Sequence, residues 1–163
     1  MFAELSRLRM YYEAYGDGSA PPVVLLHGGL SGAQTWASQV EALSDRYRVV
    51  VPEQQGHGHT PDLDAPLTYQ TMAEDTVEFM ERVAGQRAHV VGHSDGGILG
   101  LFIALQRPDL LGRAVVIGAN YHKDGLLSSP STSGGSDDEE FATSRDSPPA
   151  RKTSSPGSRS WSS

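Results

Sequence analysis

Four short runs of aliphatic and β-branched residues restrict the fold of this chain more than any other feature. They span residues 22–27, 47–51, 88–91 and 114–117. Each run is nearly continuous rather than alternating, a pattern typical of strands buried on both faces, as in a parallel sheet. We therefore expect these runs to form the centre of one sheet.

Helical patterns separate the predicted strands. Apolar residues recur at helical spacing over 36–43 and 72–83, and a third helix is predicted from Asp95 to Gln106, ended by Pro108. Thr71 and Glu74 have the spacing of a capping box at the start of the second helix. With an early strand over 8–15, strands alternating with helices predict an α/β fold with a doubly wound, mostly parallel sheet.

A short segment between the third run and the third helix carries the main chemical signal. Residues 92–97 read GHSDGG, which matches G-x-S-x-G after a predicted strand and before a predicted helix. Such a turn raises the Ser94 hydroxyl to a helix N-terminus, where developing negative charge is stabilised. The pattern predicts Ser94 as a nucleophile and the N–H of Asp95 as an oxyanion donor. A plain turn with a capping serine is the alternative.

The loop after the first buried run reads HGGL over residues 27–30. Acyl transfer needs a second N–H donor for the oxyanion, and a loop beside the nucleophile supplies it. We predict Gly29 as this donor and Leu30 as the next candidate, which is also a candidate substrate-binding residue. The alternative is that the glycines only turn the chain. For His27 we predict a structural, hydrogen-bonded role.

Residues 52–60 read PEQQGHGHT and contain His57 and His59. We interpret this pair as solvated loop histidines rather than metal ligands, because no third ligand lies at suitable spacing nearby.

Three motifs in this order, H-G-G, P-[DE]-x-x-G-x-G-x-[ST] and G-x-S-x-G, resemble the α/β-hydrolase superfamily across about residues 8–125. Residues 117–120 also look like the family near the start of its cap domain. The resemblance implies a serine hydrolase that forms an acyl-Ser94 intermediate on an ester, lactone or related acyl substrate. It implies no cofactor and no metal.

The residue after the nucleophile allows a narrower hypothesis. The segment SDGG is similar to the branch that includes biphenyl-hydrolase-like and amino-acid-ester hydrolases. That resemblance implies that the Asp95 carboxylate binds a substrate ammonium group. The alternative is that Asp95 stabilises the first turn of its own helix.

The triad acid and base are unassigned. The family order is serine, then acid, then histidine. The only histidine after Ser94 is His122, where the cap domain should start. Three later aspartates have no histidine beyond them: Asp137, Asp138 and Asp146.

Composition changes abruptly near Leu126. Of residues 126–163, 13 of 38 are serine, and few are apolar. Such a segment buries too little surface to offset its ordering entropy, so we predict a partial hydrolase core over 1–125 and a disordered tail over 126–163. We interpret the change as a frameshift or gene truncation, with a genuine tail as the alternative. The resulting chain is expected to be weakly active or inactive. A non-catalytic fragment or binding module is the competing interpretation.

Charge and cysteine content limit the partners. The net charge is -7 and there is no cysteine, so a nucleic-acid partner and disulfides are not expected. No signal peptide or membrane-spanning run is found. We predict a cytoplasmic protein with a small-molecule acyl substrate; its oligomeric state stays open.

Overall fold

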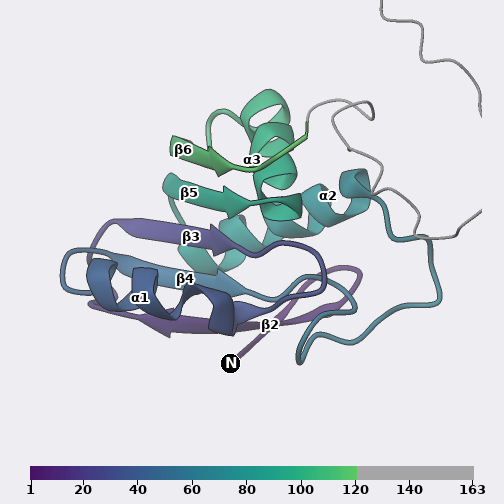
Figure 1. Cartoon of the computed structure of the whole chain (residues 1–163), viewed down its shortest axis with the longest axis horizontal. Coiled ribbons are helices and arrows are strands. Elements are labelled where there is room, and N and C mark those ends of the chain that lie inside the picture. Colours follow the sequence, from purple (N-terminus) through teal and green to yellow (C-terminus); the bar gives the residue numbers. More distant parts are fainter. Residues whose placement is uncertain (121–163) are drawn as a thin grey trace, which may run out of the picture. The chain divides into compact units, whose positions relative to one another are not determined.

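The computed structural model describes residues 1–120, which form one six-stranded sheet with helices on both faces (Figure 1). Spatial order across the sheet is β1-β2-β4-β3-β5-β6. The strands are β1 (Phe2–Glu4), β2 (Arg9–Tyr15), β3 (Pro22–Leu26), β4 (Arg48–Pro52), β5 (Ala88–His93) and β6 (Leu111–Ile117). The helices are a 3₁₀ turn (Ala33–Trp36), α1 (Ala37–Leu43), α2 (Tyr69–Phe79), a π-helical turn (Met80–Ala84) and α3 (Asp95–Gln106). None of them is long and apolar enough to cross a bilayer.

Parallel pairing is confined to the four strands of the aliphatic runs. β3 pairs in parallel with β4 and β5, and β5 pairs in parallel with β6. β2 pairs antiparallel with β4 and with β1. The short connection between β1 and β2 allows only an antiparallel hairpin, because a parallel pair needs a crossover. The predicted α/β fold is confirmed, and β1 is a strand that the sequence did not reveal.

Side chains of the central strands pack on both faces of the sheet. In β3, Val24 and Leu26 join a core cluster with α2 and α3, whereas Val23 and Leu25 pack with Trp36 on the opposite face. All five residues of β3 are buried. This two-sided burial explains the continuous apolar run, since a strand with helices above and below has no face in water.

The start of α2 differs from the prediction. The N-cap is Thr68, whose side chain accepts the N–H of Thr71, while the Thr71 hydroxyl accepts the N–H of Thr68. The predicted box of Thr71 with Glu74 is therefore wrong by three residues. Thr71 occupies the third helical position and supplies the side-chain acceptor that Glu or Gln usually provides there. Glu74 instead accepts a hydrogen bond from Gln70.

Candidate active site

Ser94 lies at the turn between β5 and α3, with backbone torsions of φ 52° and ψ -117°. L-residues rarely adopt this conformation, and it persists only where the surrounding structure imposes it. The Ser94 N–H donates to the carbonyl of Ile117 on β6 at 2.8 Å. The side chain makes no capping hydrogen bond to α3, although Ser94 is its N-cap residue. The capping-serine alternative is therefore wrong, and within residues 1–120 no hydrogen bond occupies the hydroxyl.

Two glycines allow the tight turn around Ser94. A Cβ at Gly92 would overlap the carbonyl of Gly96, and a Cβ at Gly96 would overlap the carbonyl of Leu26 at the end of β3. Backbone of three segments thus approaches within contact distance at this point. Both glycines of G-x-S-x-G are required by close packing rather than by their own torsion angles.

The loop of residues 27–31, here named the oxyanion loop, lies against the nucleophile turn. A Cβ at Gly28 would lie 3.1 Å from the Cβ of Ser94. At Gly29 a Cβ would overlap Oδ2 of Asp95. Within residues 1–120, the N–H groups of Gly29 and Asp95 form no hydrogen bond with a side chain or with the backbone of a turn, loop or cap. Both N–H groups therefore remain candidate donors to an oxyanion at Ser94.

The Asp95 carboxylate, in the first turn of α3, contacts the first residue of α2. Its Oδ1 accepts a hydrogen bond from the Tyr69 hydroxyl at 2.7 Å. That hydrogen bond, with burial as a second cause, raises the pKa of Tyr69 to about 12, so the phenol stays protonated and donating at neutral pH. Asp95 and Tyr69 line a hollow of about 380 Å³ together with His57, Leu67, Thr68 and Met72.

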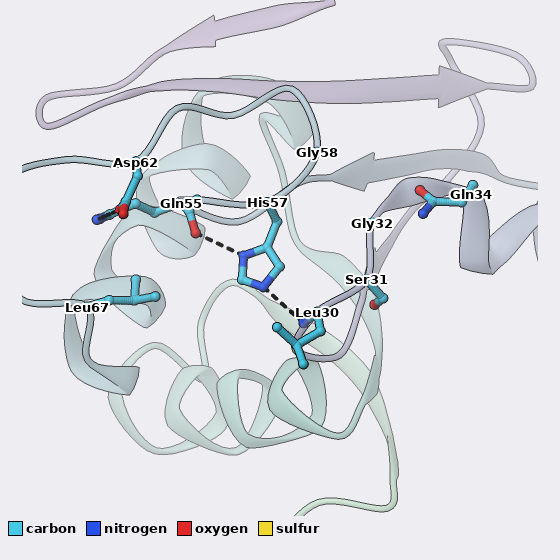
Figure 2. Close-up of a pocket in the computed structure, with 10 residues that line it drawn as sticks. Leu30, Ser31, Gly32, Gln34, Gln55, His57, Gly58, Asp62 and Leu67 are labelled. Atoms are coloured by element: carbon cyan, nitrogen blue, oxygen red, sulfur yellow. Dashed lines mark hydrogen bonds between the residues drawn. The ribbon is translucent and has the colours of Figure 1, made fainter.

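A second hollow, of about 460 Å³, lies between the oxyanion loop and residues 53–60, here named the histidine loop (Figure 2). Figure 2 shows the His57 ring reaching across it to Leu30. The Leu30 N–H donates to Nε2 of His57 at 3.2 Å, and Nδ1 of His57 lies 2.9 Å from the carbonyl of Gln55. Leu30 has a left-handed backbone (φ 57°) and a fully exposed side chain.

The histidine loop is anchored by a buried carboxylate. Glu53 accepts hydrogen bonds from the N–H and Nδ1 of His59 and from the N–H of Ala33. Burial by itself raises the pKa of Glu53, but these hydrogen bonds outweigh it and hold that pKa below its ordinary value. His57 is half-buried with both ring nitrogens bonded, so the interpretation as a solvated loop histidine is wrong for this residue. His59 is exposed, although it contacts Glu53.

His27 has the structural role that we predicted. Its ring is buried, its Nδ1 lies 2.7 Å from the carbonyl of Gly28, and its Nε2 accepts the N–H of Gln54 at 3.0 Å. Burial is the main cause of a pKa of His27 below the ordinary value, so the ring is neutral near pH 7.

No acid or base is hydrogen-bonded to Ser94 within residues 1–120. His93 is exposed and its ring lies near Gly28 and Gly118. His122 and the three later aspartates lie outside the described residues, as does the predicted tail. In the part of the chain that the structure describes, no group of three His, Asp or Glu side chains could hold a metal ion.

Two contributors to this region were missed at the level of sequence. Tyr69 contacts Asp95 across 26 positions, and His57 contacts Leu30 across 27. If Thr68 had been identified as the N-cap, the sequence would have placed Tyr69 at the start of α2, which is the end of the helix nearest the site. No local pattern identifies the partner of His57.

Comparisons with known proteins agree with this geometry. A family model described as "alpha/beta hydrolase fold" matches residues 21–148. A curated relative from Caulobacter sp. (strain K31), "Putative carbamate hydrolase RutD", is 41% identical over 111 residues, which cover 66% of this chain and 41% of the relative. A second RutD, from Agrobacterium fabrum (strain C58 / ATCC 33970), is 37% identical over 113 residues, covering 68% and 43%.

A comparison with solved structures also finds a hydrolase. The enol-lactonase from Burkholderia xenovorans LB400 superposes with a TM-score of 0.70 at 29% identity, covering 73% of this chain and 46% of its own. This chain therefore spans less than half the length of the relatives that it matches. The family match includes the buried strands, the oxyanion loop and the turn at Ser94, and we conclude that the chain belongs to the α/β-hydrolase fold family.

Proposed function

We propose that this protein is the nucleophile-bearing part of a serine hydrolase, in which Ser94 attacks the carbonyl of an acyl substrate. The observation that carries the proposal is the Ser94 hydroxyl on a strained turn at the N-terminus of α3, where no group of residues 1–120 forms a hydrogen bond with it. A residue is kept in such a conformation where the site requires it, and the helix N-terminus favours the negative charge that develops during attack.

Attack by Ser94 forms a tetrahedral intermediate whose oxyanion accepts hydrogen bonds from the N–H groups of Gly29 and Asp95. The leaving group departs to give acyl-Ser94, and water then cleaves this ester to release the acid. The Ser94 proton must pass to a base. Within residues 1–120 no side chain is hydrogen-bonded to Ser94 to accept it, so the base and acid stay unassigned.

The substrate class follows from the serine and from the relatives. A serine nucleophile suits esters, lactones and related acyl groups. The curated relatives are named "Putative carbamate hydrolase RutD", and one solved neighbour is named an enol-lactonase. We therefore include carbamates with esters and lactones as substrates to be tested.

The Asp95 carboxylate supports a narrower candidate, a preference for acyl groups that carry an ammonium ion. It lines the hollow of about 380 Å³ one residue from the nucleophile. A carboxylate at this place attracts a cationic substrate by a charge-assisted hydrogen bond. The Asp95→Asn variant should lose the preference for α-amino esters over neutral esters. An unchanged ratio of kcat/KM for the two ester classes would contradict this candidate.

A fluorophosphonate probe tests the activated serine. Covalent labelling of the full chain at Ser94, even if slow, should be lost in Ser94→Ala and kept in Ser19→Ala, a control on the exposed turn before β3 whose hydroxyl donates to Asp17. Circular dichroism would establish that each variant is folded. Absence of labelling in folded wild-type protein would instead support a non-catalytic fragment or binding module.

The remaining expectations stay predictions. They are a boundary near residue 125, a cytoplasmic location, a small-molecule substrate and the absence of a nucleic-acid or membrane partner.

A further inference from the structure

Two histidines connect the oxyanion loop and the histidine loop in a reciprocal way. His27, on the oxyanion loop, accepts the N–H of Gln54 at 3.0 Å. His57, on the histidine loop, accepts the N–H of Leu30 at 3.2 Å. The two rings lie 5.1 Å apart between centroids. Each loop thus supplies one imidazole acceptor and one backbone donor to the other.

The hydrogen bonds of His57 require one tautomer. Nδ1 faces the carbonyl of Gln55 at 2.9 Å, and a carbonyl only accepts, so Nδ1 must carry the proton. Nε2 is then unprotonated and can accept from Leu30. A ring protonated at Nε2, whether as the other tautomer or as the cation, would direct an N–H at another N–H.

Little else fixes the tip of the oxyanion loop. The Leu30 side chain is fully exposed and its backbone is left-handed, which costs energy in a residue with a branched side chain. Ser31 donates to the carbonyl of Gly28 at 2.7 Å, which closes the turn internally. Among the hydrogen bonds within residues 1–120, the one to His57 is therefore the bond that joins Leu30 to another part of the fold.

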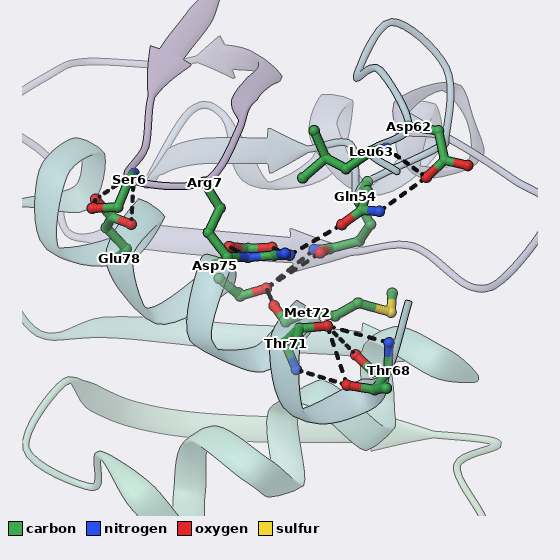
Figure 3. Close-up of polar contacts among 12 residues, drawn as sticks. Ser6, Arg7, Gln54, Asp62, Leu63, Thr68, Thr71, Met72, Asp75 and Glu78 are labelled. Atoms are coloured by element: carbon green, nitrogen blue, oxygen red, sulfur yellow. Dashed lines mark hydrogen bonds and ion pairs between the residues drawn. The ribbon is translucent and has the colours of Figure 1, made fainter. Parts of the chain in front are cut away.

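The support of His57 extends to the far side of the histidine loop. Gln55, whose carbonyl accepts from His57, also accepts a hydrogen bond from Arg7 at its side-chain oxygen and donates to Asp62 at 2.9 Å. Arg7 is in turn held by a two-point ion pair with buried Asp75 on α2 (Figure 3). The position of the His57 ring is thus set by a continuous polar network.

We propose that His57 is a positioning residue, which holds the Leu30 N–H so that the preceding N–H, that of Gly29, faces the oxyanion formed at Ser94. The proposal rests on the proposed function for its catalytic meaning. In this arrangement the Leu30 N–H is used by His57, so Gly29 and Asp95 are the two oxyanion donors.

The first test is the tautomer of His57 in the unmodified full chain, read from long-range ¹H–¹⁵N NMR correlations at pH 8. We expect the proton on Nδ1. A proton on Nε2 would overturn the proposal, because Nε2 could not then accept from Leu30. This measurement needs no variant and does not depend on catalysis.

The second test is the rate at which the Leu30 amide exchanges with water. In His57→Phe we expect exchange at least about fivefold faster, because the amide loses the protection of one ordinary hydrogen bond. The control is His59→Phe on the same loop, which should leave the Leu30 rate unchanged because the His59 ring is exposed and Glu53 keeps its hydrogen bonds from the N–H groups of Ala33 and residue 59. Equal Leu30 rates in wild type and His57→Phe would overturn the proposal.

Fluorophosphonate labelling separates the two proposals. Slower labelling of Ser94 in His57→Phe than in His59→Phe supports the positioning role in catalysis, and equal labelling rates would overturn that role. If the wild type itself is not labelled, the proposed function fails, while the tautomer and exchange results still decide whether His57 holds the loop.

Discussion

Ser94 keeps its strained torsions, with a positive φ, because neighbouring residues leave little room for relaxation. Its N–H is bound to Ile117 of β6, and α3 begins directly after it. Gly96, two residues into α3, packs against the carbonyl of Leu26. The geometry of the nucleophile therefore depends on this contact between α3 and β3 as well as on the hydrogen bond to β6.

Two glycines of α3 allow a matched test. A methyl group at Gly96 would overlap the Leu26 carbonyl, so Gly96→Ala should lower the free energy of unfolding by at least about 3 kcal/mol. At Gly100 the nearest atoms lie 3.8 Å from a Cβ, so Gly100→Ala should be neutral or stabilise by about 0.5–1 kcal/mol through helix propensity. Urea unfolding measures both. Equal effects of the two substitutions would contradict the close contact.

His27 should make stability depend on pH. Burial lowers its pKa in the folded chain below the ordinary value of 6.5. As the pH falls below about 6.5, the unfolded chain binds a proton that the folded chain does not, so the free energy of unfolding falls. We expect a lower free energy at pH 5 than at pH 7 in urea unfolding, and a smaller difference in His27→Gln. The same pH slope in both proteins would show that His27 is not responsible.

Among the elements, the β1–β2 hairpin is tied to α2 by one buried carboxylate. Arg7 donates to both oxygens of Asp75, at 3.0 and 2.7 Å. The Asp75 side chain is only 3% exposed, so its carboxylate is shielded from water, whereas the Arg7 side chain is 31% exposed. Ser6 adds hydrogen bonds to Glu78 one turn further along α2 (Figure 3).

Removal of the Arg7 guanidinium should therefore lower the free energy of unfolding. Arg7→Met leaves the Asp75 carboxylate buried without its cation, and we expect a loss of about 2–4 kcal/mol in the free energy of unfolding. Arg9→Met is the control, because Arg9 pairs with Glu4 at the surface and such pairs contribute less than about 1 kcal/mol. Thermal or urea unfolding compares the two, and similar losses would contradict the importance of burial.

Elements with a strong local pattern were predicted well. α3 begins at Asp95 and ends at Gln106 as expected, because a glycine-rich turn and a proline mark its ends. β1 was missed because three residues at the chain start have no periodicity to detect. For the candidate site, the turn at Ser94 and the HGG loop could be found from motifs. The contacts of Tyr69 and His57 could not, since they join residues far apart in sequence and depend on loop conformation.

At the largest scale, that of residues 1–120 together, β6 carries exposed apolar side chains. Within residues 1–120 it pairs only with β5, and Val115 and Ile117 are 52% and 45% exposed. Both side chains lie on the same face of the strand, since residues two apart share a face. Exposed apolar surface on a strand with a free edge favours association between chains.

Polar substitutions on this face should reduce association. In Val115→Thr/Ile117→Thr we expect a smaller increase of apparent mass with concentration than in wild type, measured by sedimentation velocity. Leu105→Thr on α3 is the control, since Leu105 is 84% exposed but lies on a helix with no free strand edge. If the control reduces association as much as the double variant, the strand face is not the cause.

The reciprocal histidine contacts also bear on how this region can be redesigned. Because His27 needs a backbone donor from the histidine loop and His57 needs one from the oxyanion loop, neither loop is complete without the other. A chimera whose new loop lacks the matching histidine would leave a backbone N–H of the other loop without its acceptor. An exchange with such a hydrolase therefore has to move both loops together.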